Sequence, residues 1–200
     1  METNKKYFKS FSRNNAEFSA PYDFYSTNKD SVRTFLKEFL KEHEINYVWE
    51  CACGKGNIAK VLDEFKIKHI DTDLIDRNFG TGNVDFLEQD KLIDNDIDVI
   101  MTNPPFKFSD EFIEKAIELK PSKYIIIYFA LTILEGKNRY NKIWSMYNPY
   151  RVYIHPSRQG CDIEGREEFK NSGPRCYLWL VFDTQDYSKD PVIKWLPINS

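Results

Sequence analysis

Apolar residues recur along the chain at two different spacings, which predict two kinds of element. Val32, Phe35 and Phe39 lie at the three- and four-residue intervals of one helix face. Short and almost continuous apolar runs, such as residues 124–129, are typical of buried strands. The pattern predicts helices over about 29–42, 57–65, 110–119 and 131–146, and strands at about 47–50, 67–72, 84–87, 97–102, 124–129, 151–154 and 177–182.

The predicted strands and helices alternate along most of the chain, which is the pattern of an α/β fold. Apolar strands need cover on both faces, so the alternation predicts a mostly parallel sheet of about seven strands with helices on both sides. The sequence contains no repeat, low-complexity segment or linker that would divide it. We therefore expect an N-terminal arm over residues 1–22 and a single domain over residues 23–200.

Charge limits the ways in which this chain could bind nucleic acid. Its 200 residues carry a formal net charge of -3, and the pI is about 5.7. Contacts with a phosphate backbone would therefore need a local basic patch. The arm offers four basic residues interleaved with aromatic ones, namely Lys5, Lys6, Lys9 and Arg13. A frayed terminus is the alternative interpretation of the arm.

The sequence predicts neither a membrane segment nor a metal site. No apolar run has the length of a signal peptide core or a membrane span, so we expect a cytoplasmic protein without a membrane partner. The four cysteines and three histidines do not cluster, and Cys51 and Cys53 are too close together for a usual zinc pair. We expect no metal site and reduced thiols.

A glycine turn follows the first predicted strand of the sheet. The segment Glu50-Cys51-Ala52-Cys53-Gly54-Lys55-Gly56 leads directly into the predicted helix at 57–65. Glycines allow a tight turn and the close approach of a nucleotide beside a helix N-terminus. A dinucleotide fingerprint would place a third glycine where this chain has Ala59, which disfavours a dinucleotide-dependent oxidoreductase.

Acidic residues follow the next two predicted strands. Asp73 lies seventeen positions after Gly56, and an acid in this place can accept hydrogen bonds from both hydroxyls of a ribose. Asp85 at the end of the following strand can accept from an adenine amino group, and Phe86 can cover the ring. Each acid could also be a solvated loop charge. Their order, at the ends of successive strands, favours a nucleotide site.

The predicted strand at 97–102 ends in Asn103-Pro104-Pro105-Phe106. Two prolines stop a strand, which is the simplest interpretation of the motif. The motif also suits transfer to a planar amine whose lone pair is delocalised. The Asn103 side-chain oxygen and the Pro104 carbonyl can accept both N–H groups and favour a more tetrahedral nitrogen. Phe106 can stack on a base that has been turned out of a duplex.

Together these motifs resemble those of the adenine-N6 DNA methyltransferases, particularly the small enzymes of bacteriophages. The resemblance covers roughly residues 22–183 and implies a Rossmann-like, class I S-adenosylmethionine-dependent methyltransferase fold. It implies Asn103, Pro104, Pro105 and Phe106 as catalytic residues. It implies S-adenosyl-L-methionine as cofactor, bound by Tyr25, Thr27, Glu50, Cys51, Ala52, Cys53, Gly54, Gly56, Asp73, Leu74, Asp85 and Phe86. DNA is the implied partner, in the host cytoplasm if the chain is encoded by a phage.

The chain departs from this family in its target-recognition region, which is usually a sizeable insertion. Here only the loop at about 156–175 is long enough to suggest such a role, and its charge is balanced. The basic residues that would contact nucleic acid, besides those of the arm, are Arg139, Arg158, Arg166, Lys170 and Arg175. Similar motifs occur in enzymes that methylate RNA bases or protein amides. These substrates, and a non-catalytic binding module, therefore stay open as alternatives.

Overall fold

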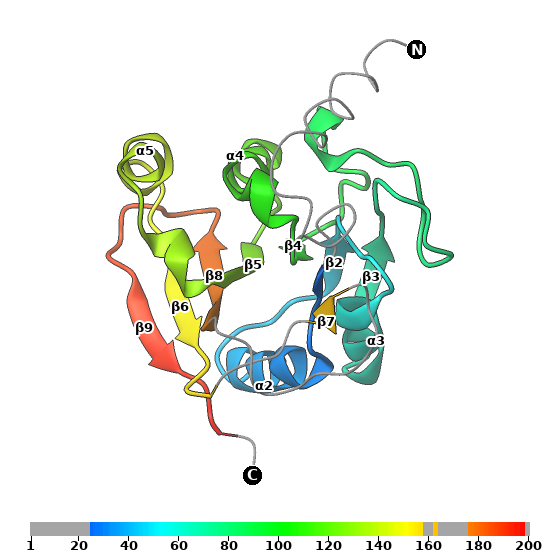
Figure 1. Ribbon diagram of the computed structural model, residues 1–200, viewed down its shortest axis with the longest axis horizontal. Coiled ribbons are helices and arrows are strands. Elements are labelled where there is room, and N and C mark those ends of the chain that lie inside the picture. The colour runs from blue at the N-terminus through cyan, green and yellow to red at the C-terminus, as the bar shows by residue number, and fades with distance from the viewer. Residues whose placement is uncertain (1–24, 158–161, 164–175, 199–200) are drawn as a thin grey trace.

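The computed structural model describes residues 25–157, 162–163 and 176–198. A seven-stranded sheet with the strand order β3-β2-β4-β5-β8-β6-β9 forms its centre (Figure 1). The strands of this sheet are β2 (Tyr47–Glu50), β3 (Lys68–Asp71), β4 (Val99–Thr102), β5 (Tyr124–Ala130), β6 (Arg151–Ile154), β8 (Tyr177–Asp183) and β9 (Val192–Trp195). A separate antiparallel pair joins β1 (Tyr25–Ser26) to β7 (Asp162–Ile163).

The sheet is mostly parallel, as the sequence predicts. Strands β3, β2, β4 and β5 pair in parallel, whereas β8 is antiparallel to both of its neighbours, β5 and β6. The edge strand β9 pairs in parallel with β6. Among these seven strands, β8 alone therefore runs against the common direction.

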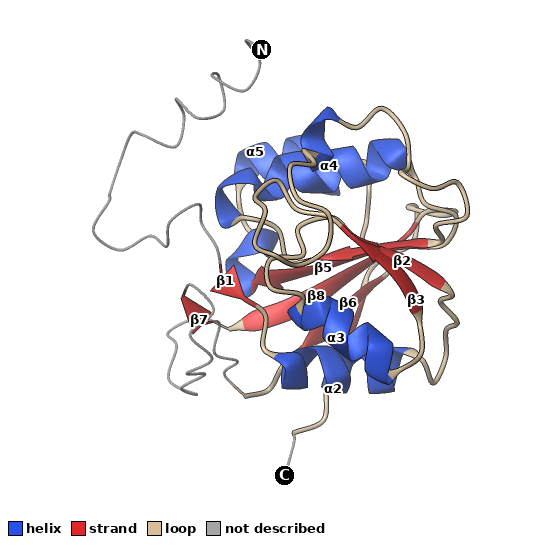
Figure 2. Cartoon of the chain, turned by 90° about the vertical axis from the view of Figure 1, so that its right-hand side faces the viewer, coloured by secondary structure: helices blue, strands red, loops and turns tan. Residues whose placement is uncertain are grey.

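Helices cover both faces of the sheet (Figure 2). Helices α2 (Lys29–Phe39) and α3 (Asn57–Glu64) lie on one face, and α4 (Ser109–Leu119) and α5 (Lys137–Arg139) lie on the other. Side chains of a strand alternate between the two faces, so Val48 packs into the core beneath α2, while Trp49 packs into the core beneath α4. The continuous apolar strands of the sequence are thus explained by burial on both sides.

Two predicted elements differ in the structure. Residues 84–87 do not form a strand, because the Asp85 carboxylate accepts from Leu87 N at 2.9 Å and caps the short 3-10 helix η2 (Phe86–Glu88). The seventh strand of the sheet is instead β9, which the sequence pattern did not predict. The helix predicted at 131–146 is broken into the 3-10 helix η4 (Leu131–Leu134), α5 and the π-helix η5 (Tyr140–Trp144).

A single residue explains the break in that helix. Gly136 has φ +116°, far from helical geometry, and separates η4 from α5. The other predicted elements are present with ends shifted by up to three residues, a usual uncertainty of helix and strand ends. The arm over 1–22 lies outside the described residues. Across the described part of the chain, no helix has both the length and the apolar character needed to cross a membrane.

Candidate functional site

A pocket opens at the carboxyl ends of β2 and β4. These strands are neighbours, but the chain leaves β2 through α3 toward β3 on the other side, so the pocket lies where the strand order reverses. Ligands of open α/β sheets bind at this position. The pocket encloses about 1020 Å³, open solvent at its mouth included. A volume of this order can hold a nucleoside-sized ligand.

Most of the predicted cofactor residues line this one pocket. Those that do are Thr27, Glu50, Cys51, Ala52, Cys53, Asp73, Leu74, Asp85 and Phe86. Asn103, Pro104 and Pro105 of the predicted catalytic motif line it as well. Lining residues that the sequence did not single out are Ser26, Lys55, Asn57, Ile58, Ile75, Arg77, Val84, Leu87, Phe108 and Phe112. The predicted cofactor and catalytic motifs are therefore parts of one site.

The two predicted glycines shape the turn behind the pocket. Gly54 and Gly56 have left-handed φ values of +58° and +76°, and Gly56 N donates to Cys53 O at 2.8 Å. Neither glycine is among the pocket-lining residues. The ring of Phe79 lies against Gly56, where an added Cβ would be 2.2 Å from a ring atom. The second glycine is thus explained by a close approach within the protein.

Replacing Gly56 with alanine should therefore destabilise the fold. The left-handed backbone costs about 1–2 kcal/mol, and the new methyl group must displace the Phe79 ring. We expect a fall in melting temperature of about 4–8 °C, measured by circular dichroism. As the control, Gly56→Ala should cost less in a Phe79→Ala background. Strictly additive effects of the two substitutions would contradict this explanation of the glycine.

Asp73 joins two segments around the pocket. Its side chain is 8% exposed, and its Oδ2 accepts from Gly54 N at 2.8 Å. Its Oδ1 accepts from Ile75 N, also at 2.8 Å. Each carboxylate oxygen has a second lone pair, so both can still accept from a ligand hydroxyl. Asp73 therefore fixes the glycine turn relative to the loop that carries Leu74 and Ile75.

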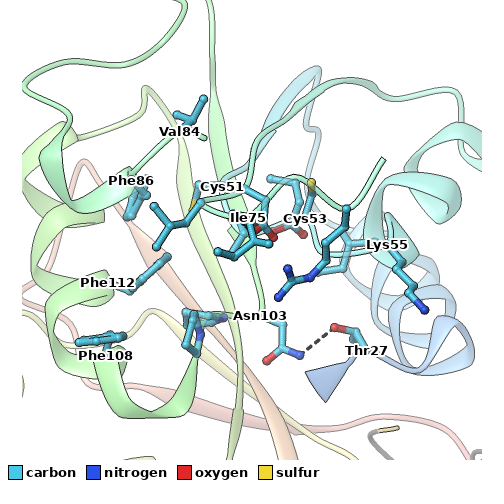
Figure 3. Close-up of a pocket in the computed structure, with 18 of the residues that line it drawn as sticks. Thr27, Cys51, Cys53, Lys55, Ile75, Val84, Phe86, Asn103, Phe108 and Phe112 are labelled. Atoms are coloured by element: carbon cyan, nitrogen blue, oxygen red, sulfur yellow. Dashed lines mark hydrogen bonds between the residues drawn. The ribbon is translucent and has the colours of Figure 1, made fainter. Parts of the chain in front are cut away.

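The pair Asp85 and Phe86 also lines the pocket. The Phe86 side chain is 2% exposed and stacks on Phe112 at a ring-centroid distance of 5.0 Å, with the Trp49 ring edge-on at 5.3 Å. Most of its ring is thus packed in the core. Phe86, Phe108 and Phe112 lie together on the side of the pocket opposite Thr27 (Figure 3). This side offers an apolar surface to a flat ring.

The floor of the pocket holds a buried carboxyl group and two thiols. Burial raises the pKa of Glu50 well above its usual value, and the nearby carboxylates Asp71 and Asp73 raise it further. Burial also raises the pKa of Cys51 and of Cys53. Only thiolates are good nucleophiles, so these cysteines are not suited to covalent catalysis. A ligand cation at this floor would favour the ionised form of Glu50.

The Asn-Pro-Pro-Phe motif follows β4, and its residues have different surroundings. Pro104 is buried and lines the pocket together with Asn103 and Pro105. Phe106 begins the 3-10 helix η3 (Phe106–Phe108) and is directed toward Tyr177, at a ring-centroid distance of 6.5 Å. Phe108, at the other end of η3, lines the pocket instead. Phe108 thus lines this pocket, whereas Phe106, two positions earlier, lies beside Tyr177.

A polar network ties the catalytic motif to the start of the described chain. Asn103 Nδ2 donates to Thr27 Oγ1 at 2.9 Å, drawn as the dashed line in Figure 3. Asn57 Nδ2 donates to Thr27 O at 2.8 Å and to Ser26 Oγ at 3.2 Å. Ser26, Thr27 and Asn57 are all buried. These pairs are 30 to 76 positions apart in the sequence, which is why no local pattern indicated them.

The predicted nucleic-acid contacts are mostly outside the described residues. This holds for Lys5, Lys6, Lys9, Arg13, Arg158, Arg166, Lys170 and Arg175. Of the predicted cofactor residues, Tyr25 is described only as the first residue of β1. Arg139 is described, and its guanidinium donates to Asp110 Oδ1, Ile133 O and Glu135 O. These three bonds give Arg139 a role in holding α5 against α4. Within the described ranges, no group of three or more His, Cys, Asp or Glu side chains could hold a metal ion.

Solved structures of methyltransferases are similar to this chain over most of its length. A Listeria monocytogenes protein assigned as a class I S-adenosylmethionine-dependent methyltransferase has a TM-score of 0.57 and 12% identity, over 94% of this chain and 68% of that one. The chain has the class I S-adenosylmethionine-dependent methyltransferase fold. This confirms the fold predicted from the sequence.

Two further structures with this fold carry different assignments. A Vibrio vulnificus YJ016 protein, assigned as the modification subunit of a type I restriction enzyme, has a TM-score of 0.57 and 12% identity over 98% of this chain. The match covers 51% of that protein, so this chain spans about half its length. A Pyrococcus horikoshii protein, assigned as an RNA methyltransferase, has a TM-score of 0.54 and 16% identity, over 92% of this chain and 98% of that one.

All three assignments are themselves provisional. No protein-family model matches the chain, and no curated protein matches it in sequence. At identities of 12 to 16%, the methyltransferase fold is what these structures share with the chain. Substrate choice must therefore be argued from the site itself.

Proposed function

We propose that this protein transfers a methyl group from S-adenosyl-L-methionine to the exocyclic N6 amine of adenine in DNA. The observation that carries the proposal is the position of Asn103 and Pro104, which line the same pocket as the glycine-turn segment and the acids Asp73 and Asp85. A planar amine and a nucleoside cofactor could thus meet in one cavity. The acceptors suit the amine, and the acids suit the cofactor.

The residues of the pocket fit the chemical groups of this cofactor. Asp73 can accept hydrogen bonds from the ribose hydroxyls, and Asp85 can accept from the adenine amino group. Leu74 and Ile75 on one side, and the Phe86 region on the other, offer apolar walls to the adenine ring. The buried Glu50 suits a cationic ligand, because a nearby positive charge favours its ionised form.

The catalytic motif can prepare the acceptor amine. When bound, the cofactor supplies a methyl group on a positively charged sulfur. The Asn103 side-chain oxygen and the Pro104 carbonyl would accept the two N–H groups of the amine and stabilise the positive charge that develops as its nitrogen forms the new bond. The surplus proton then leaves to water. Proline fixes the direction of the carbonyl, so that positioning supplies much of the rate.

Three observations favour DNA among the substrates with a planar amine. The motifs resemble those of adenine-N6 DNA methyltransferases, the arm is basic and aromatic, and one similar structure is assigned as a restriction-enzyme modification subunit. An RNA base or a protein amide is the second candidate, because a comparably similar structure is assigned as an RNA methyltransferase. A cofactor-binding module without catalysis is the third, and an intact Asn103 argues against it.

Cofactor choice can be measured before the substrate is known. A ligand at about 100 times its dissociation constant stabilises the folded state by roughly 2.7 kcal/mol. For a chain of this size we expect S-adenosylhomocysteine to raise the melting temperature by about 5–10 °C. NAD serves as the control and should produce no shift. A shift with NAD alone would contradict the proposed cofactor.

The substrate is tested by methyl transfer from labelled cofactor to unmethylated DNA, RNA and bulk protein in parallel. Nucleoside analysis of the product should give N6-methyladenine from DNA. Label in RNA or protein alone would support methyl transfer but would show that the substrate is not DNA. No label in any of the three, together with a clear cofactor shift, would favour the binding module.

A further inference from the structure

The side-chain amide of Asn103 must present its oxygen, and not its nitrogen, to a substrate amine. An amide can turn by 180° about its last bond with little change in shape, and the turned form would point N–H groups at N–H groups. Hydrogen-bond partners therefore decide which atom faces the substrate. In the structure, the nitrogen is turned to Thr27 Oγ1 at 2.9 Å (Figure 3).

Thr27 is well placed to act on this amide. Its side chain is 5% exposed and lines the same pocket. Its carbonyl accepts from Asn57 Nδ2 at 2.8 Å, which ties it to the first residue of α3. The adjacent Ser26 belongs to β1, whose pairing with β7 fixes the backbone on the other side. The backbone that carries the hydroxyl is thus held by two neighbouring elements.

We propose that Thr27 is a positioning residue that orients the Asn103 amide so that its oxygen accepts from the substrate amine. The inference rests on the proposed methyl transfer. In the observed arrangement, the Thr27 hydroxyl accepts from Asn103 and keeps its own proton for another acceptor. A carboxylate bound beside Thr27 would accept a hydrogen bond from the hydroxyl and so keep its oxygen turned toward Asn103 as an acceptor.

Strand β1 ends at Ser26, directly before Thr27, and pairs with β7. Ser26 pairs with Asp162 and Tyr25 with Ile163, and both partners lie in the long segment predicted to meet the substrate. The strand pair therefore links that segment to the residue next to Thr27.

The first test compares Thr27→Val with Thr27→Ser in single-turnover methyl transfer at saturating cofactor and substrate. Valine has nearly the shape of threonine but no hydroxyl, so we expect a rate about 10- to 30-fold lower, with cofactor affinity within about 3-fold. Serine keeps the hydroxyl and should stay within about 3-fold of the wild-type rate. Thr184→Val is the matched control, since Thr184 is also buried and donates to Lys123 O but is not among the pocket-lining residues.

The second test reads the amide itself and needs no substrate. In the ¹⁵N spectrum of asparagine-labelled wild-type protein, the Asn103 Nδ2 protons, assigned with Asn103→Asp, should exchange slowly with water. Exchange should become about 10-fold faster in Thr27→Val and stay slow in Thr27→Ser. Adding S-adenosylhomocysteine should slow the wild-type exchange further.

The two tests separate the possible failures. A wild-type rate in Thr27→Val, or fast amide exchange in the wild-type protein, overturns the role of Thr27. The role is also overturned if Thr27→Val binds the cofactor more weakly but transfers methyl at the full rate when cofactor is saturating. That result would make Thr27 a cofactor ligand only. If no substrate is methylated, the proposed function fails by itself, whereas the amide exchange still shows whether Thr27 orients Asn103.

Discussion

Replacing Asn103 with alanine is expected to lower the single-turnover rate of methyl transfer about 100- to 1000-fold. The substitution removes the side-chain acceptor beside Pro104, and loss of one such preorganised group costs about 100- to 1000-fold in comparable sites. The neighbouring Thr27 hydroxyl also loses its contact at 2.9 Å. The rate is measured with labelled cofactor in excess over the substrate.

Cofactor binding supplies the control for this prediction. Asn103 meets the amine, whereas Asp73 and Asp85 meet the nucleoside part of the cofactor, so the dissociation constant of S-adenosylhomocysteine should stay within about 3-fold in Asn103→Ala. Asn103→Asp keeps a side-chain oxygen and should lose less activity than the alanine variant. Equal losses of cofactor binding and transfer would remove Asn103 from the catalytic role.

The fold was predictable because its signals are local. Strand β5 (Tyr124–Ala130) is a continuous apolar run, and α2 (Lys29–Phe39) has one apolar face behind an Asn28 cap whose side chain accepts from Asp30 N. The failures are also local in origin. At Asp85, side-chain capping of a turn outweighed the strand propensity of its neighbours, and at Gly136 a left-handed φ interrupted a helical pattern.

The site was predictable as a set of motifs but not as a set of contacts. Residues at the ends of parallel strands meet at one edge of the sheet, so Glu50, Asp73 and Asn103 had to come close together. Which aromatic side chain lines the pocket depends on the turn of η3, where Phe108 lines it and Phe106 lies beside Tyr177. Sequence spacing does not contain that information.

The glycine turn is a second example of a contact that the sequence does not reveal. The sequence predicts the position of the turn after β2 and relates the glycines to a tight turn and to the approach of a nucleotide. In the structure, the need for Gly56 comes from Phe79, twenty-three positions later, whose ring occupies the space of the missing side chain. A glycine indicates a close approach, and only the three-dimensional arrangement shows what approaches.

Replacing Asp73 with alanine is expected to raise the dissociation constant of S-adenosylhomocysteine about 100-fold. Two effects act together. The carboxylate that would accept from the ribose hydroxyls is lost, and hydrogen bonds to a charged group contribute about 1.5–3 kcal/mol. The bonds from Gly54 N and Ile75 N, both 2.8 Å long, are lost as well, which loosens the turn and the apolar wall of the pocket. Isothermal titration calorimetry measures the constant.

The control for this prediction is Asp76→Ala, which distinguishes loss of the ribose contact from a general effect of lost charge. Asp76 lies in the same loop, its carboxylate accepts from Asn78 N at 2.9 Å, and it is not among the pocket-lining residues. Asp76→Ala removes the same charge and a similar turn contact. The dissociation constant of S-adenosylhomocysteine should therefore change by less than about 3-fold in this variant. At saturating cofactor, Asp73→Ala should recover most of the transfer rate, because Asn103 and Pro104 are unchanged. An unaltered affinity in Asp73→Ala would remove Asp73 from the cofactor site and leave it only the role of fixing the turn.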